Sequence, residues 1–146
     1  KAGLEKQAWS PGIEIIKTPN AILRTNIMKF IKNKKLKWIV VPLRKGEDVA
    51  KSRGAMGHGQ NGGYWAGAKN KHEMKIINDD LLSNLFYLCA EHNIEMITIA
   101  FPRDVNDADY MYTRLEPIFK HYRINKDSFV NAHKIIATPS FVHSFG

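Results

Sequence analysis

The chain has 146 residues, of which 44% are hydrophobic and 25% are charged. This composition is typical of a globular protein and argues against a disordered, collagen-like or disulfide-framework chain. Its 22 Lys and Arg residues against 14 Asp and Glu residues give a formal net charge of +8. Such a charge favours a polyanionic partner, which includes nucleic acid, phosphorylated small molecules and acidic proteins, although a basic surface also serves solubility alone.

The length predicts a single α/β domain over residues 1–146. No apolar run approaches the ~20 residues that span a bilayer, so no membrane partner is expected. No signal segment opens the chain, and the single cysteine, Cys89, cannot form an internal disulfide. Cys89 lies in an apolar helical stripe, where we expect an inert buried thiol. We therefore expect a cytoplasmic protein, and the sequence indicates no cofactor.

In the first part of the chain, a β-branched run at residues 13–16 lies between prolines and predicts a short strand. Apolar residues at helical spacing predict an amphipathic helix over residues 20–33, with lysines crowding its end. Residues 36–43 then form a consecutive apolar run, which predicts a strand buried on both faces until Pro42 interrupts it.

In the second part, the acidic segment at residues 78–80 predicts the start of a helix that ends near residues 92–93. A second buried strand is expected over residues 94–101. Asp107 and Asp109 can cap a third helix, in which Pro117 introduces a kink or resets the start. A tail strand is expected at residues 135–137.

Strands that are separated by helices predict mostly parallel pairing, with helices on the faces of the sheet. In such folds ligands bind beyond the carboxyl ends of the strands. This geometry selects two expected loops, at residues 44–71 and at residues 103–109.

The first loop contains a glycine-rich segment, residues 53–67, with six of the ten glycines of the chain. Glycines let backbone N–H groups approach and cradle a phosphate, and the two aromatic residues can stack on a base or ribose. The alternative is a flexible surface loop without a ligand. The dinucleotide and P-loop glycine motifs are absent in their required context. The candidate ligand-binding residues of this segment are Met56, Gly57, Gly59, Asn61, Gly62, Gly63, Tyr64 and Trp65.

The same segment resembles phosphate loops of the macrodomain family. Residues 56–59, Met-Gly-His-Gly, resemble the M-G-x-G loop of one macrodomain subclass, and residues 62–68 are similar to the G-G-G-V-A-G-A loop of another. Residues 99–103 with 115–119 are similar to the family's strand that ends in P-R-I-G-C-G and the helix that follows. Residues 104–107, Asp-Val-Asn-Asp, stand where the family has its second glycine loop. The resemblance implies a macrodomain-like α/β fold that binds ADP-ribose, and an activity that hydrolyses ADP-ribosyl linkages, as in some family members.

Titratable residues beside these loops are candidates for chemistry. His58 can donate a proton from the glycine loop, and Asp104 and Asp107 follow a predicted strand, where carboxylates activate water or bind a ribose hydroxyl. Capping and turn formation are the structural alternatives for the two aspartates. Arg44 and Arg103 can clamp an anion at adjacent strand ends. The six histidines show no metal-ligand spacing, so no metal site is expected.

We interpret the chain as a domain that binds a nucleotide diphosphate such as ADP-ribose. The alternative is a basic nucleic-acid-binding protein or nuclease, and a third hypothesis is an interaction module without a ligand. For the nucleic-acid alternative, phosphates would be contacted by the lysines around the end of the first helix. These are Lys29, Lys32, Lys34, Lys35 and Lys37.

Overall fold

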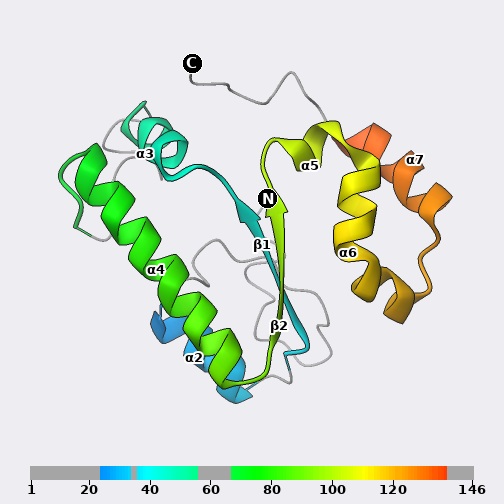
Figure 1. The fold of residues 1–146 in the computed structure, drawn as a ribbon, viewed down its shortest axis with the longest axis horizontal. Coiled ribbons are helices and arrows are strands. Elements are labelled where there is room, and N and C mark those ends of the chain that lie inside the picture. Colours follow the sequence, from blue (N-terminus) through cyan, green and yellow to red (C-terminus); the bar gives the residue numbers. More distant parts are fainter. Residues whose placement is uncertain (1–23, 34–35, 56–66, 138–146) are drawn as a thin grey trace.

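The computed structural model of the protein describes residues 24–33, 36–55 and 67–137. Over these residues the fold is mixed α/β and mostly helical, with a two-stranded parallel sheet flanked by helices (Figure 1). No helix in this part of the chain is long and apolar enough to cross a membrane. The elements are α2 (Arg24–Asn33), β1 (Trp38–Leu43), α3 (Gly46–Ala55), α4 (Lys71–Glu91), β2 (Glu95–Ala100), α5 (Arg103–Asn106), α6 (Ala108–Tyr122) and α7 (Lys126–Ile136).

The two strands pair in parallel, as the sequence predicted, from Trp38 opposite Glu95 to Leu43 opposite Ala100. Side chains alternate between the two faces of a strand, so residues that are paired in register share a face. One face of the sheet is covered by α2 and α4, and the other by α6 with α7 beyond it (Figure 1). The sheet therefore forms the middle layer of the described structure.

The core between the sheet and helices α2 and α4 is built from small and aliphatic side chains. Ile27 of α2 packs with Leu85, Leu88 and Cys89 of α4. Cys89 is buried, as expected, and desolvation raises the pKa of its thiol. Because only the thiolate is a strong nucleophile, this environment makes the thiol unreactive.

The core on the opposite face is built around Ile97 and Ile99 of β2, which are 4% and 1% exposed. Leu115 and Phe119 of α6 pack over them. The ring of Phe119 lies 4.7 Å from that of Phe129, which attaches α7 to the outer side of α6. Aromatic pairs at this distance are favourable, and here they provide the packing contact between the last two helices.

The expectation that both strands are buried on both faces is only partly correct. Ile39 and Val41 of β1 pack against the α2 and α4 core, but Val40 is 39% exposed and Pro42 is exposed. β1 therefore buries one face more fully than the other. The predicted first strand, at residues 13–16, lies outside the described residues.

The outer edge of β2 is closed by side chains of α6. The Ala100 N–H donates to the Tyr110 hydroxyl at 2.8 Å, and the Thr98 carbonyl accepts from Arg114 Nε at 2.8 Å. In a parallel pair these alternate residues point their backbone groups away from the partner strand. Two polar groups that a further strand would need are therefore already occupied.

Helix α4 begins earlier than the sequence analysis predicted. Its first residue is Lys71 instead of a residue at 78–80, because Asn70 caps it: Asn70 Oδ1 accepts the Glu73 N–H at 2.9 Å. Glu73 Oε1 in turn accepts from Asn70 Nδ2 at 2.9 Å, and Glu73 Oε2 accepts the Lys69 N–H at 2.8 Å, so Glu73 holds the capping side chain and the residue before it. Asp79 does not start the helix but forms an exposed i,i+4 ion pair with Lys75.

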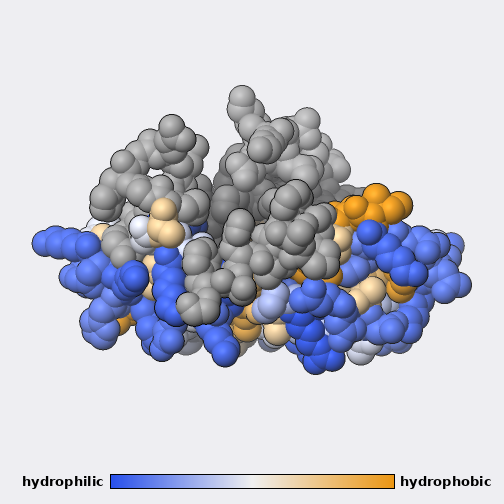
Figure 2. Space-filling model, turned by 90° about the horizontal axis from the view of Figure 1, so that it is seen from above, coloured by the Kyte–Doolittle hydropathy of each residue, from blue (hydrophilic) through white to orange (hydrophobic). Residues whose placement is uncertain are grey.

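Three further expectations were wrong in detail. The loop expected at residues 44–71 contains helix α3, and the loop expected at 103–109 contains the single turn α5. The strand expected at residues 135–137 is instead the end of α7, where Ile135 and Ile136 are 83% and 77% exposed. Figure 2 shows this apolar surface at the end of the molecule where α7 lies. Among the residues that the structure describes, neither isoleucine packs on the sheet, so their β-branched character does not determine the local structure.

Candidate functional site

The carboxyl ends of β1 and β2 bring two of the predicted anion-binding residues to one edge of the sheet. Arg44 follows β1, and Arg103 begins α5 just after β2. The hydrogen bond from the Phe101 N–H to the Leu43 carbonyl, 2.8 Å, extends the ladder to this point.

Both guanidinium groups lie over aromatic rings. The Cζ atom of Arg44 is 4.6 Å from the ring centroid of Phe101, and that of Arg103 is 4.1 Å from the ring centroid of Tyr110. Cation–π stacking restricts a long side chain while the in-plane N–H donors point sideways. The arrangement therefore presents two oriented guanidinium groups at the strand ends.

Asp107 holds Arg103 and caps helix α6. Its Oδ2 accepts from both Nε and Nη2 of Arg103 at 3.1 Å, and its Oδ1 accepts the Tyr110 N–H at 2.8 Å. The Tyr110 hydrogen bond, followed by the Arg103 hydrogen bond, lowers the pKa of the Asp107 carboxyl. A carboxylate with these contacts stays ionised at neutral pH, which suits a structural role better than proton transfer.

Asp104 lies in a different environment within the same turn. Its Oδ1 is buried and has no hydrogen-bond partner in the described part of the chain. Desolvation raises the pKa of the Asp104 carboxyl, against the opposing effects of backbone hydrogen bonds and of His133. The pKa values of the two predicted aspartates are therefore shifted in opposite directions, and Asp104 is the one whose protonated form is favoured relative to an ordinary aspartate.

His133 of α7 contacts this turn and was missed by the sequence analysis. Its Nε2 is 2.7 Å from the backbone carbonyl oxygen of Asp104. The signal that could have found it is the spacing of Phe129 and His133, which share one face of a helix capped by Asn125. The β-branched residues Ile135 and Ile136 favoured the prediction of a strand where this helix ends.

The remaining predicted site residues lie outside the described residues. This applies to His58 and to the whole ligand-binding set of the glycine loop: Met56, Gly57, Gly59, Asn61, Gly62, Gly63, Tyr64 and Trp65. Within residues 24–33, 36–55 and 67–137, no group of three His, Cys, Asp or Glu side chains could hold a metal ion.

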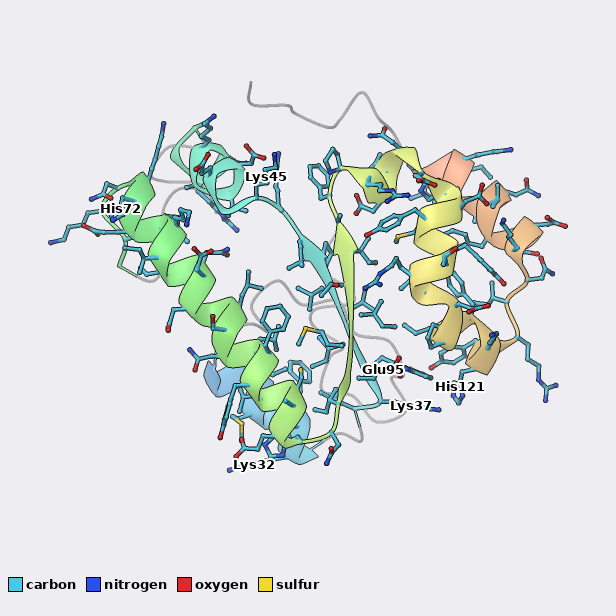
Figure 3. All side chains as sticks on the ribbon, in the orientation of Figure 1. Lys32, Lys37, Lys45, His72, Glu95 and His121 are labelled. Atoms are coloured by element: carbon cyan, nitrogen blue, oxygen red, sulfur yellow. The ribbon has the colours of Figure 1, made fainter. Side chains whose placement is uncertain are left out.

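A second cluster lies at the opposite, amino end of the strands, where Lys37, Glu95 and His121 come together (Figure 3). Lys37 Nζ lies 3.3 Å from His121 Nδ1 and 4.4 Å from the ring centroid of Trp38. Trp38 Nε1 donates to Glu95 Oε2 at 2.7 Å. The indole is thus fixed on two sides by polar contacts, next to the last turn of α6.

Comparisons of the chain with protein-family models, with curated proteins and with solved structures found no match.

Proposed function

We propose that the protein binds a phosphorylated nucleotide of the ADP-ribose type at the carboxyl ends of β1 and β2. The observation that carries the proposal is the meeting of three features at this edge: two arginines held on aromatic rings, and the Asp104 carboxyl, whose Oδ1 is buried without a hydrogen-bond partner among the described residues. Arginines recognise phosphate oxygens through paired N–H donors, and a nucleotide diphosphate offers two such groups. A macrodomain-like site is our proposal for how the glycine loop would complete the phosphate contacts.

The direction of most helices supports this end of the sheet over the other. Helices α3, α5 and α6 begin at the carboxyl edge, where α7 ends, whereas α2, α4 and α6 end at the opposite edge (Figure 1). Helix amino ends favour anions and carboxyl ends favour cations. Glu47 and Asp48 already occupy the first turn of α3, so the arginines, and not this helix, are the groups that we assign to phosphate.

Asp104 is the residue that we assign to proton transfer if the bound nucleotide is also hydrolysed. A carboxyl whose pKa is raised by desolvation holds or accepts a proton closer to neutral pH than an exposed aspartate does. Attack of water on an ADP-ribosyl linkage requires such a group to take the proton of the water. Asp107 would then hold Arg103 in place.

Nucleic acid is the second candidate partner, supported by exposed cations at the amino end of the strands. Lys32 and Lys37 are exposed there, and Lys37 lies beside Trp38 (Figure 3). These positions also have a structural explanation, because Lys32 occupies the last turn of α2 and complements its dipole. We therefore place nucleic acid second; the other lysines proposed for it, Lys29, Lys34 and Lys35, have side chains outside the described residues.

Calorimetric titration distinguishes the two candidates. ADP-ribose and ADP are titrated against the full chain, alongside short single- and double-stranded oligonucleotides, at two salt concentrations. We expect ADP-ribose to bind with weak salt dependence, since only about two phosphates are neutralised. Steeply salt-dependent oligonucleotide binding without ADP-ribose binding would refute the proposal.

Matched variants locate the site. Arg44→Ala should weaken ADP-ribose binding about tenfold or more, since it removes a charge-assisted contact. Gly57→Val should also weaken it, by placing a Cβ where the phosphate is expected. Lys32→Ala, at the opposite end of the sheet, is the control and should change little; if nucleic acid is the ligand, Lys32→Ala and Lys37→Ala should be the damaging variants instead.

A further inference from the structure

We propose that α7 supports the carboxyl-edge site through His133, which acts as a positioning residue that holds the α5 turn and keeps Asp104 Oδ1 away from water. The assignment of α5 to a ligand site rests on the proposed function. The positioning contact itself is a property of the free protein and can be tested without a ligand.

The hydrogen-bond partner determines which nitrogen of the His133 ring carries a hydrogen. A backbone carbonyl can only accept a hydrogen bond, so His133 Nε2, 2.7 Å from the Asp104 oxygen, carries the hydrogen. The contact joins residues 29 positions apart in the chain and comes from a half-buried side chain. It therefore links two elements that are not neighbours in sequence.

Helix α5 depends on contacts outside itself. It has four residues, no buried residue and no side-chain cap at its start, Pro102. Its turn is closed by hydrogen bonds from the Val105 N–H to Pro102 O, 3.1 Å, and from the Asp107 N–H to Arg103 O, 2.9 Å. A single turn is unstable alone because nucleation fixes several residues for one hydrogen bond. A tertiary hydrogen bond to its second residue is thus well placed to stabilise it.

Helix α7 can provide this support because one of its faces is anchored. Phe129 packs on Phe119 and lies 5.8 Å from Tyr112, and the His133 ring lies 5.8 Å from that of Phe129, one turn earlier. None of the residues of α7 is fully buried. The docking of α7 therefore depends on this aromatic face, and His133 extends that face to Asp104.

The contact with His133 affects the environment of the Asp104 carboxyl. Its Oδ1 is buried without a partner among the described residues, which is costly for an ionised oxygen, so the arrangement persists only while other contacts hold the turn in place. If the His133 contact were lost, the turn could open and water could reach the carboxyl. The environment that suits Asp104 for proton exchange would then be lost.

The test compares His133→Gln and His133→Phe with the wild type in the free, full chain. Gln keeps a side-chain N–H donor, whereas Phe keeps a ring against Phe129 but has no donor. Two quantities are measured by nuclear magnetic resonance: the water-exchange rates of the Val105 and Asp107 amides, and the titration of the Asp104 carboxyl carbon. Lys134→Ala, at the exposed neighbouring position, is the control.

With His133→Phe we expect amide exchange about fivefold faster, the ratio that corresponds to one net hydrogen bond. We also expect the Asp104 titration to fall to the range of an ordinary aspartate. His133→Gln and Lys134→Ala should stay close to wild type. If His133→Phe fails to fold, His133→Asn, whose amide is too short to reach the carbonyl, repeats the test with the same expected result.

Unchanged exchange and titration in the donor-free variants would overturn the proposal, and so would equal effects of the Gln and Phe substitutions. Absence of ADP-ribose binding would instead refute the proposed function and leave the result on His133 intact. The two failures are therefore distinguishable.

Discussion

Replacing Asp104 with asparagine should stabilise the protein while removing the group that we assign to proton transfer. Asparagine has nearly the same shape and keeps an oxygen that can accept the Val105 backbone N–H, but it carries no charge to desolvate. The amide also leaves a polar atom unpaired at the Oδ1 position, so only the desolvated charge distinguishes the two side chains. Because the Asp104 side chain is only partly buried, we expect at most about 1 kcal/mol of stabilisation at pH 7, or roughly 3 °C in Tm.

The effect of Asp104→Asn should depend on pH with a defined sign. Burial raises the pKa of Asp104 in the folded state above its ordinary value of 3.8, so the folded protein binds this proton more tightly than the unfolded chain does. The wild type therefore loses stability as the pH rises from 3.8 through the folded-state pKa, and asparagine does not. The gain from the substitution should be full above the folded-state pKa of Asp104 and vanish below 3.8.

Urea denaturation at pH 7 measures the size of the stability gain, and thermal melts from pH 3 to pH 7 measure the pH range over which it appears. Asp104→Asn that destabilises the protein at pH 7 would refute the reasoning, because it would mean that the carboxylate has a favourable partner. A gain that persists unchanged at pH 3 would also refute it, since the charge would then not be the cause.

Three further substitutions test the fold and the site. Asn70→Ala should lower the free energy of unfolding by about 1 kcal/mol because it removes the N-cap of α4. Asn70→Ser keeps an oxygen for the Glu73 N–H without adding a charge beside the Glu73 carboxylate, so it should lose less; urea midpoints decide. Ile99→Ala should lower the free energy of unfolding by about 3 kcal/mol, because the Ile99 side chain is only 1% exposed. Val40→Ala should lower it by less than about 1 kcal/mol, because Val40 is 39% exposed. Equal losses of stability would contradict the described core. Asp107→Asn should remove the stability that the wild type gains from the ionised Asp107 carboxylate, which is present above pH 3.8 and is lost as the pH falls through the lowered pKa of Asp107. The melting temperatures of the two proteins should therefore converge in strong acid. A constant difference would exclude the ion pair with Arg103 as the cause.

The elements that the sequence predicted well are those with a strong local signal. Asp107 was expected to cap a helix, and α6 begins directly after it. The consecutive apolar runs at residues 36–43 and 94–101 were expected to be parallel strands, and they contain β1 and β2. In α6 the capping residue, and in β1 and β2 the apolar run, favour the same local structure as the tertiary packing does.

The elements that were missed have a weak or misleading local signal. Helix α3 buries only Ala50, in a small cluster with Met74 of α4, so it has no apolar stripe to recognise. The acidic residues at 78–80 resemble a helix start but lie in the middle of α4, because the N-cap at Asn70 begins the helix two turns earlier.

For the candidate site, the sequence placed Arg44, Arg103, Asp104 and Asp107 next to strand ends. It could not separate the two aspartates, because that difference depends on burial and on the tertiary contact with Arg103, which spacing alone does not reveal.

The occupied outer edge of β2 hinders the addition of a further strand on that side of the sheet. Tyr110 and Arg114 satisfy the outward N–H of Ala100 and the outward carbonyl of Thr98, so a strand that approached from this side would have to displace two hydrogen bonds before it formed any. β2 therefore acts as a terminus for strand addition. At the other edge of the described pair, Pro42 of β1 has no N–H to offer an added strand. The same two side chains of α6 thus protect the protein from edge-to-edge aggregation through β2.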